Sequence, residues 1–390
     1  MVTNGTGQIS FHAHQDGGLL FNGADRQLYG LDPVSGYCWL ELNEGQAEAD
    51  IADALVATFQ LEEQTAREWV DRLKDQFDQN GLLACDQSSA NTQEGKTEQT
   101  HVRSLPASPH TRVSSHPCQS FDLSFIVWAT IDDLQRLAPL LAPLSSALSD
   151  TRLTRFTIVE EKPGFRNVFI DETLSEADIP VEHLITVMEG IIQTQALRQS
   201  DYLIALHCAL VSRTTEGQGG LILAGESGSG KSTLSIAMSE SGWVFGSDDL
   251  SILTRDLTVR PAGLNPCVKD GALDIIECYH PSIRSQVSFD RFGRNARYDA
   301  EIKQRCQEAT VLAVIFPTYA EGAETQLERL DGGEGLQKLL AQCLNVSGDF
   351  SHGEVALLAA WHDRLDYYAL PFDTPDAAIR VLDAAFPGTQ

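Results

Sequence analysis

A glycine-rich segment at residues 225–232, GESGSGKS, has the composition and spacing of a phosphate-binding loop. Its glycines let successive backbone N–H groups turn toward one anion, and the positive end of the following helix favours the same anion. In such a loop Lys231 reaches the β- and γ-phosphates of a nucleotide, and Ser232 ligates Mg²⁺. We predict that the nucleotide is bound by Gly225, Glu226, Ser227, Gly228, Ser229, Gly230, Lys231, Ser232 and Thr233.

The elements expected on either side of this loop are the ones that a phosphate site needs. The apolar run at 221–224 predicts a buried strand before the loop. Gly242 is expected to end a helix of about ten residues after it. A glycine-rich turn that binds no ligand is the alternative, and the strand–loop–helix order disfavours it.

Two adjacent carboxylates, Asp248 and Asp249, follow Lys231 by 17 and 18 residues. The apolar run at 243–245 predicts a strand, so both carboxylates would lie at its end, beside the loop. One carboxylate there could hold Mg²⁺ through water while the other accepts a proton from a hydroxyl nucleophile. An Asp-Asp pair alone usually marks only a turn, and its position relative to the loop favours the functional interpretation.

Residues 86–118 divide the chain into two domains. This segment contains no Phe, Tyr, Trp or Ile and is rich in Ser, Thr, Gln and Pro, so it cannot bury enough apolar surface to offset its ordering entropy. We predict a flexible linker at 86–118 between a first domain at 1–85 and a second domain at 119–390. Within the second domain, 119–205 would extend the catalytic core at its N-terminal side.

The first domain is expected to be a small α+β unit of winged-helix type. Its pattern predicts three short strands at 8–14, 18–23 and 27–32, followed by three helices that begin at Pro33 and end before Gly81. In the second domain, apolar runs predict strands and helices at 121–131, 155–160, 167–171, 184–192, 203–213, 311–317, 361–372 and 374–386.

Net charge, the lengths of apolar runs and the cysteine pattern argue against several classes of protein. The chain has 28 Lys and Arg against 55 Asp and Glu, a net charge of −27, which argues against general binding to nucleic acid or anionic lipid. No apolar run approaches the roughly 18 residues of a membrane span, and no secretory signal is recognisable at the start. The 8 scattered cysteines fit reduced thiols, so we expect a cytoplasmic protein.

Residues 29–83 resemble the PqqD-like peptide chaperones, which recognise leader peptides in ribosomal peptide biosynthesis. The resemblance is carried by the apolar spacing, by Asp32-Pro33 and by Gly81-Leu82-Leu83. It implies that a precursor or leader peptide adds as a strand to a sheet edge, opposite the helix at 62–79. The edge residues would be Gln27, Leu28, Tyr29, Gly30 and Leu31. A winged-helix domain used only for dimerisation or scaffolding is the alternative.

Residues 203–253 resemble the HPr kinase/phosphorylase family in their order of a strand carrying His207, a phosphate loop, a helix and Asp248-Asp249. The resemblance implies an α/β fold with a P-loop core of the HPr kinase/PEP carboxykinase-like type and a mixed sheet. It further implies ATP and Mg²⁺ as cofactors, Asp249 as proton acceptor with Asp248 in support, and His207 near the transferred phosphoryl group.

The downstream part of this resemblance is weaker. Asp274 only loosely matches the acidic Mg²⁺ ligand that would complete a set with Ser232 and Asp248. The run FDRFG at 289–293 is similar to a family motif and makes Arg291 a candidate charge stabiliser, with Arg294 and Lys269 as further options. The hairpin after His207 is longer than in the bacterial regulatory enzyme, and the usual N-terminal domain of that enzyme is missing.

Together the two resemblances imply a kinase that phosphorylates a Ser or Thr hydroxyl of a precursor peptide held by the first domain. A flexible tether would raise the local concentration of the acceptor. The alternatives are a kinase or phosphorylase for a small hydroxyl compound, such as free serine, and a protein in which ATP only gates peptide binding. The hexamers of the HPr kinase family also imply a homo-oligomer in which a second subunit completes the site.

Overall fold

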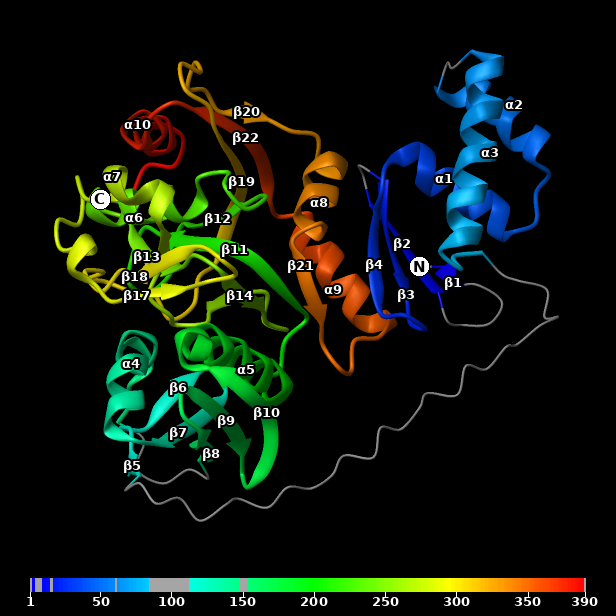
Figure 1. Cartoon of the computed structure of the whole chain (residues 1–390). Coiled ribbons are helices and arrows are strands. Elements are labelled where there is room, and N and C mark those ends of the chain that lie inside the picture. The colour runs from blue at the N-terminus through cyan, green and yellow to red at the C-terminus, as the bar shows by residue number, and fades with distance from the viewer. Residues whose placement is uncertain are drawn as a thin grey trace.

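The computed structural model describes residues 2–3, 9–14, 17–59, 62–83, 112–147 and 153–388, and Figure 1 shows how its elements are arranged. The described residues up to 83 form a small first unit, and those from 112 onward form a larger α/β unit. Among these residues, no helix combines the length and the apolar character that crossing a membrane requires.

The first unit is a four-stranded antiparallel sheet in the order β1-β2-β3-β4, with helices packed on one face. The three predicted strands and three predicted helices are confirmed, and β1 is an additional short strand. The elements are β1 (Val2–Thr3), β2 (Ile9–His14), β3 (Gly17–Asn22), β4 (Gln27–Leu31), α1 (Pro33–Asn43), α2 (Glu48–Phe59) and α3 (Glu63–Gln79).

Local signals explain where the helices of this unit begin and end. The Asp32 carboxylate accepts hydrogen bonds from the backbone N–H groups of Val34 and Ser35, at 2.9 Å each, and so caps α1. Gly81 follows α3 with a φ of 63°, which a glycine adopts without steric cost. The unit's core closes where the Trp39 indole N–H donates to the Leu82 carbonyl at 2.7 Å.

The second unit begins with a six-stranded sheet whose main path runs β10-β9-β8-β7-β5, with β6 paired to β7. One helix, α5, packs in an apolar cluster that this sheet shares with later strands of the second unit. The elements are β5 (Val113–Ser114), β6 (Cys118–Ser120), β7 (Leu123–Ala129), α4 (Ile131–Leu141), η1 (Ala142–Leu144), β8 (Thr154–Lys162), β9 (Phe165–Ile170), β10 (Thr173–Pro180), η2 (Val181–His183) and α5 (Leu184–Gln199).

The linker prediction at 86–118 extends too far toward its C-terminal end. Residues 84–111 lie outside the described part of the chain, but Val113–Ser114 and Cys118–Ser120 form β5 and β6. Both strands pair antiparallel with β7. Such short strands form because β7 offers free backbone groups, and a polar local sequence gives no sign of that long-range pairing.

The central part of the second unit is a nine-stranded mixed sheet with the main path β15-β14-β11-β12-β19-β22-β20 and with β13 and β21 paired to β11. A three-stranded sheet, β16-β18-β17, lies beside it. The strands are β11 (Ile204–Ser212), β12 (Gly220–Ala224), β13 (Val244–Ser247), β14 (Leu250–Leu253), β15 (Val259–Pro261), β16 (Cys267–Lys269), β17 (Ser288–Asp290), β18 (Asn295–Tyr298), β19 (Val311–Tyr319), β20 (Glu328–Arg329), β21 (Cys343–Val346) and β22 (Asp366–Phe372). The helices are α6 (Lys231–Glu240), η3 (Asp270–Ala272), α7 (Leu273–Ile276), η4 (Ile283–Ser285), α8 (Gly332–Leu340), α9 (His352–His362) and α10 (Pro375–Ala385).

The two units pack directly against each other, with β4 next to α8 in Figure 1. The sheet face that the first unit's own helices leave open carries Leu19 and Phe21, which belong to an apolar cluster of the second unit. The rings of Phe21 and Phe350 meet edge to face at 4.8 Å between centroids. The Arg26 guanidinium also donates to the Gly348 carbonyl at 2.7 Å. The first unit is therefore held by packing, and its position does not depend on a tether alone.

Candidate functional site

The glycine-rich loop connects β12 to α6, as the sequence predicts. Gly225, Gly228 and Gly230 have φ values of 147°, 95° and 98°, a backbone region that favours glycine. At Gly230 the space is also closed, because an added Cβ would lie 2.7 Å from the ring of Phe372. The loop therefore requires glycine both for its backbone curve and for its fit against β22.

Lys231 lies inside the curve of this loop. Its side chain is buried, and its Nζ donates to the carbonyl oxygens of Gly225, at 2.5 Å, and Glu226, at 3.0 Å. Burial lowers the pKa of the Lys231 ammonium from its ordinary value. An ammonium group whose hydrogen bonds go to neutral carbonyls can exchange them for an anion, which is the arrangement expected of a phosphate site.

Asp248 and Asp249 lie between β13 and β14, and they line the same cavity as the phosphate loop. Asp248 is buried and accepts a hydrogen bond from the Cys267 backbone N–H at 3.0 Å. Burial and the neighbouring Asp249 charge raise the pKa of Asp248 to about 6, although the Ser232 hydroxyl also bonds to it. Asp248 thus faces the residue from which a loop-bound Mg²⁺ would take its hydroxyl ligand.

Asp249 is held between two basic side chains. Its Oδ1 lies 2.9 Å from His207 Nδ1, and its Oδ2 accepts from Arg291 Nη2 at 2.7 Å. Burial alone would raise the pKa of Asp249, but the hydrogen bond from His207 and the charge of Arg291 outweigh it and hold the pKa well below its usual range. Asp249 is therefore ionised, and His207 and Arg291 hold its carboxylate in one orientation.

The structure adds one residue that the sequence prediction missed, Glu189 on α5. It is 4% exposed, and its carboxylate lies 3.0 Å from Arg291 Nη1. Burial raises the pKa of Glu189 to about 7, and the Asp249 charge adds to the rise while Arg291 opposes it. A sequence signal was present, because Glu189 is an acid on the buried apolar face that Met188 and Ile192 mark.

A single cavity of about 1060 Å³ brings most of these residues together. Predicted residues in its wall are His207, Ser227, Gly228, Gly230, Lys231, Ser232, Thr233, Asp248, Asp249, Lys269, Arg291 and Arg294. Gly225, Glu226 and Ser229 belong to the same loop but do not line the cavity. Lys269 reaches across the loop and donates to the Ser227 hydroxyl at 2.9 Å. The cavity therefore joins the phosphate loop and the carboxylate pair in one space.

Asp274 does not join this group. Its carboxylate pairs with Arg284, its side chain is 93% exposed, and it is absent from the cavity wall. Within the described ranges, no group of three or more His, Cys, Asp and Glu side chains could hold a metal ion. Ser232 and Asp248 alone still fit Mg²⁺, which proteins typically hold through one or two side chains while phosphate and water supply the other ligands.

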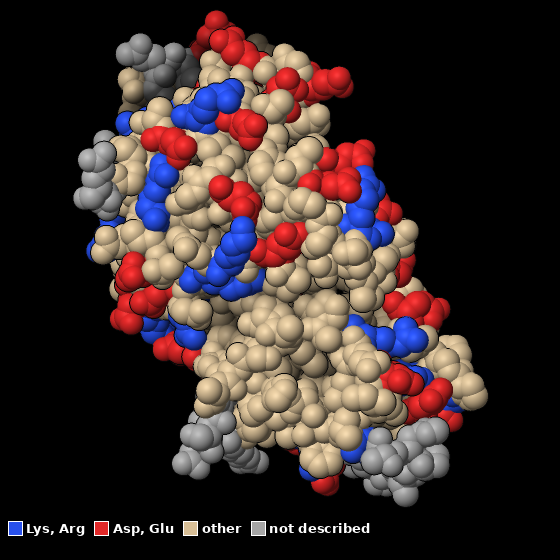
Figure 2. Space-filling model, turned by 90° about the vertical axis from the view of Figure 1, so that its left-hand side faces the viewer, with Lys and Arg blue, Asp and Glu red and all other residues tan. Residues whose placement is uncertain are grey.

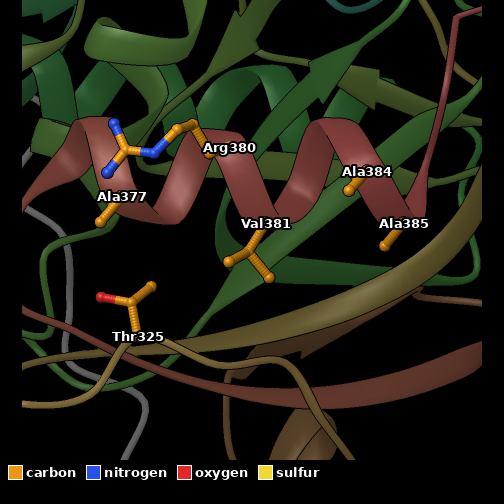
Figure 3. A pocket seen from close by; sticks show the side chains of 6 residues that line it. All are labelled: Thr325, Ala377, Arg380, Val381, Ala384 and Ala385. Atoms are coloured by element: carbon orange, nitrogen blue, oxygen red, sulfur yellow. The ribbon is translucent and has the colours of Figure 1, made fainter.

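A second depression, of about 600 Å³, lies along the outer face of α10. Figure 3 shows Val381 directed toward Thr325 across it, while the Arg380 guanidinium extends along the helix. Its wall consists of Thr325, Ala377, Arg380, Val381, Ala384 and Ala385. This wall contains no carboxylate, imidazole or thiol.

Charges of both signs are mixed on the face of the molecule seen in Figure 2. Blue and red side chains lie next to each other over its upper and middle parts, and uncharged side chains cover much of its lower part. On this face the net charge of −27 is therefore not gathered into one acidic block.

The predicted peptide edge at Gln27–Leu31 forms β4, the last strand of the first unit's sheet. Gly30 faces α8, where the Gln337 side-chain amide donates to the Gly30 carbonyl oxygen at 3.2 Å. The Tyr29 hydroxyl donates to the Gln27 side chain at 2.9 Å. One backbone acceptor of the edge is thus already paired with a side chain of the second unit.

Comparison with known proteins assigns the first unit. Residues 17–83 match the family model described as Coenzyme PQQ synthesis protein D (PqqD). The first unit is a PqqD domain. The sequence matches no curated protein. Among 28 similar chains in solved structures is one titled "TbiB1 in Complex with the TbiA(beta) Leader Peptide". It is 21% identical over 21% of this chain and 94% of that chain, with a TM-score of 0.19.

Proposed function

We propose that this protein is an ATP-dependent kinase that phosphorylates a Ser or Thr hydroxyl of a ribosomally made precursor peptide captured by its PqqD domain. The observation that carries the proposal is the shared cavity, in which Lys231 and Ser232 of the phosphate loop face the carboxylate of Asp249. Phosphoryl transfer to an alcohol needs these parts: a phosphate cradle, a metal-ligating hydroxyl and a proton acceptor.

The residues of this chain would divide the chemistry among them. The loop amides and Lys231 would hold the phosphates of ATP, and Ser232 with Asp248 would hold Mg²⁺. Mg²⁺ would supply charge neutralisation between the β- and γ-phosphates. Asp249, kept ionised by His207 and Arg291, would accept the proton of the substrate hydroxyl. Arg291 has a raised pKa and stays cationic, so it can also oppose the charge that develops during transfer.

The PqqD domain favours a peptide over a small hydroxyl compound as the substrate. An edge strand such as β4 binds an extended peptide through backbone hydrogen bonds, largely independent of sequence. Because this domain packs on the second unit through Phe21 and Phe350, a captured peptide would be held at a fixed place relative to the cavity. Docking of this kind lowers the entropic cost of presenting the acceptor hydroxyl.

The experiment is phosphate transfer to candidate precursor peptides with ATP and Mg²⁺, measured by mass spectrometry. We expect a mass increase of one phosphate on a Ser or Thr, and we expect Lys231→Ala and Asp249→Asn to slow its appearance by about 100-fold or more. Asp274→Asn serves as the matched control, because its carboxylate is exposed and outside the cavity. ATP turnover without modification of any peptide would contradict the proposal and favour a small-molecule acceptor. ATP-dependent peptide binding without transfer would favour a gated binding protein.

A further inference from the structure

A tight turn at the rim of the cavity presents an aromatic ring to solvent. Phe292 lies between β17 and β18, lines the cavity and is 85% exposed, the largest exposure among large hydrophobic side chains in the described ranges. Its backbone has a φ of 56°, a left-handed conformation that is unfavourable for a bulky residue. Neither packing nor backbone preference within the folded chain explains a phenylalanine at this position.

The turn that carries Phe292 is fixed to the rest of the protein. The Thr186 hydroxyl of α5 donates to the Asp290 carbonyl at 2.6 Å, and the Asp290 carboxylate lies 3.2 Å from His183 Nδ1. Within the turn, the Gly293 N–H donates to the Asp290 carboxylate at 3.1 Å. The turn is therefore a rigid support, and Phe292 keeps its place relative to the catalytic core.

The side chains of Arg291 and Phe292, which are neighbours in this turn, differ in where they lie. Arg291 reaches inward and binds Asp249 at 2.7 Å, whereas Phe292 is exposed at the rim. A peptide whose hydroxyl reaches Asp249 must leave the cavity over its rim, because an extended chain advances about 3.3 Å per residue. The residues next to the acceptor would then pass the ring of Phe292, and a compact hydroxyl compound would not extend that far.

We propose that Phe292 is a specificity-determining residue that packs against an apolar side chain next to the phosphorylated Ser or Thr of the peptide. This inference rests on the proposed function and names the substrate class more closely: a peptide with an apolar residue flanking its acceptor. An aromatic ring suits this role because it offers a large contact area and loses little conformational entropy on binding.

The test uses the full-length protein, ATP and Mg²⁺ with a positional-scanning library of synthetic serine peptides. We expect an apolar preference in at least one position that flanks the serine, and we expect Phe292→Ala to remove it. For the best peptide, Phe292→Ala should raise KM about five- to tenfold and leave kcat unchanged, because the contact forms equally in the ground and transition states. Phe292→Tyr should retain the preference. Phe165→Ala is the matched control, since Phe165 is also exposed, at 40%, but outside the cavity.

Other outcomes overturn the inference in distinguishable ways. Equal preferences in wild type and Phe292→Ala would overturn it and leave the kinase proposal intact. A rise in the KM for ATP with an unchanged KM for peptide would assign Phe292 to the nucleotide and also overturn it. No transfer to any peptide by the wild-type protein would overturn both the inference and the proposed function.

Discussion

The two regions to which we assign binding use different parts of the polypeptide. At β4 of the PqqD domain, a bound peptide would meet backbone N–H and C=O groups of the last strand of a sheet, where the Gly30 carbonyl is already paired with Gln337. At the cavity, the groups that face one another are titratable and charged side chains, and Arg291 joins Asp249 to the buried Glu189 behind it. A backbone edge accepts many peptide sequences, whereas a fixed set of charges selects one reaction. Changes in the two regions should therefore have separable effects on binding and on chemistry.

The largest effect is expected from Asp249→Asn. An amide cannot accept the hydroxyl proton, so kcat should fall by about 10²- to 10⁴-fold, the usual contribution of a general base. Because β4 lies in another domain, peptide affinity should stay unchanged. Steady-state phosphorylation and fluorescence anisotropy of a labelled precursor peptide measure the two quantities on one sample. A parallel loss of peptide affinity would mean that the two regions are not separable.

A second prediction concerns Glu189 and the dependence of stability on pH. Its pKa is raised to about 7 in the folded protein, against 4.5 for the ordinary side chain. The folded state then binds the proton more tightly than the unfolded state, so the free energy of unfolding falls as pH rises from about 4.5 to 7. The loss attributable to this group is on the order of 3 kcal/mol. Glu189→Gln should remove this part of the pH dependence.

Urea denaturation at several pH values between 4.5 and 7.5 measures this effect. Glu182→Gln is the control, because Glu182 is an exposed acid on the neighbouring η2. Curves for Glu189→Gln that stay parallel to those of the wild type would show that the buried carboxylate does not titrate in this range. In that case Glu189 would not be an ionisable member of the charge network around Arg291.

A change in the edge strand should affect peptide binding and leave the chemistry unchanged. Leu28→Pro removes one backbone N–H from β4, and proline within a strand weakens pairing on that side. We expect peptide affinity to fall about tenfold or more, while kcat at saturating peptide stays within about twofold of the wild type. Isothermal titration calorimetry and phosphorylation kinetics check the two parts, and thermal unfolding controls for damage to the domain. An unchanged affinity would place the peptide elsewhere on the PqqD domain.

The sequence predicts the parts of the site that depend on local spacing. The loop from Gly225 to Ser232, the strand before it and the carboxylate pair are set by short-range patterns, and the structure places them as expected. Asp274 was assigned by a loose match, and its short helix directs the side chain to Arg284 at the surface. A sequence pattern at that point gives no information on which side of a short helix faces the cavity.

The parts that the sequence did not predict depend on contacts between distant segments. Arg291 and Glu189 are 102 residues apart, and Gly30 and Gln337 are 307 residues apart. An apolar helix with one acid signals a buried partner but does not identify it. The sequence also does not predict that the PqqD domain packs on the second unit. An apolar outer face on β3 indicates a covering partner, but the sequence does not show that the second unit is that partner.

The smallest effect is expected at the contact between the two units. This contact also gives the sharpest test of whether peptide binding and chemistry are separable. Gln337 of α8 occupies the carbonyl oxygen of Gly30, an acceptor that an added peptide strand could use. Two residues beyond α8, the Gln342 carbonyl accepts from the His207 backbone N–H at 2.8 Å, so the segment after this helix contacts the strand that carries the cavity histidine. Gln337→Ala frees the acceptor, and peptide affinity should rise about fivefold, the value of one hydrogen bond. Lys338→Ala changes an exposed neighbour on the same helix and should leave peptide affinity unchanged.

Because the Gln342 contact is made by the backbone, kcat should also stay unchanged in Gln337→Ala. A lower affinity would show instead that Gln337 itself binds the peptide, and a changed kcat would show that α8 couples the edge to the cavity.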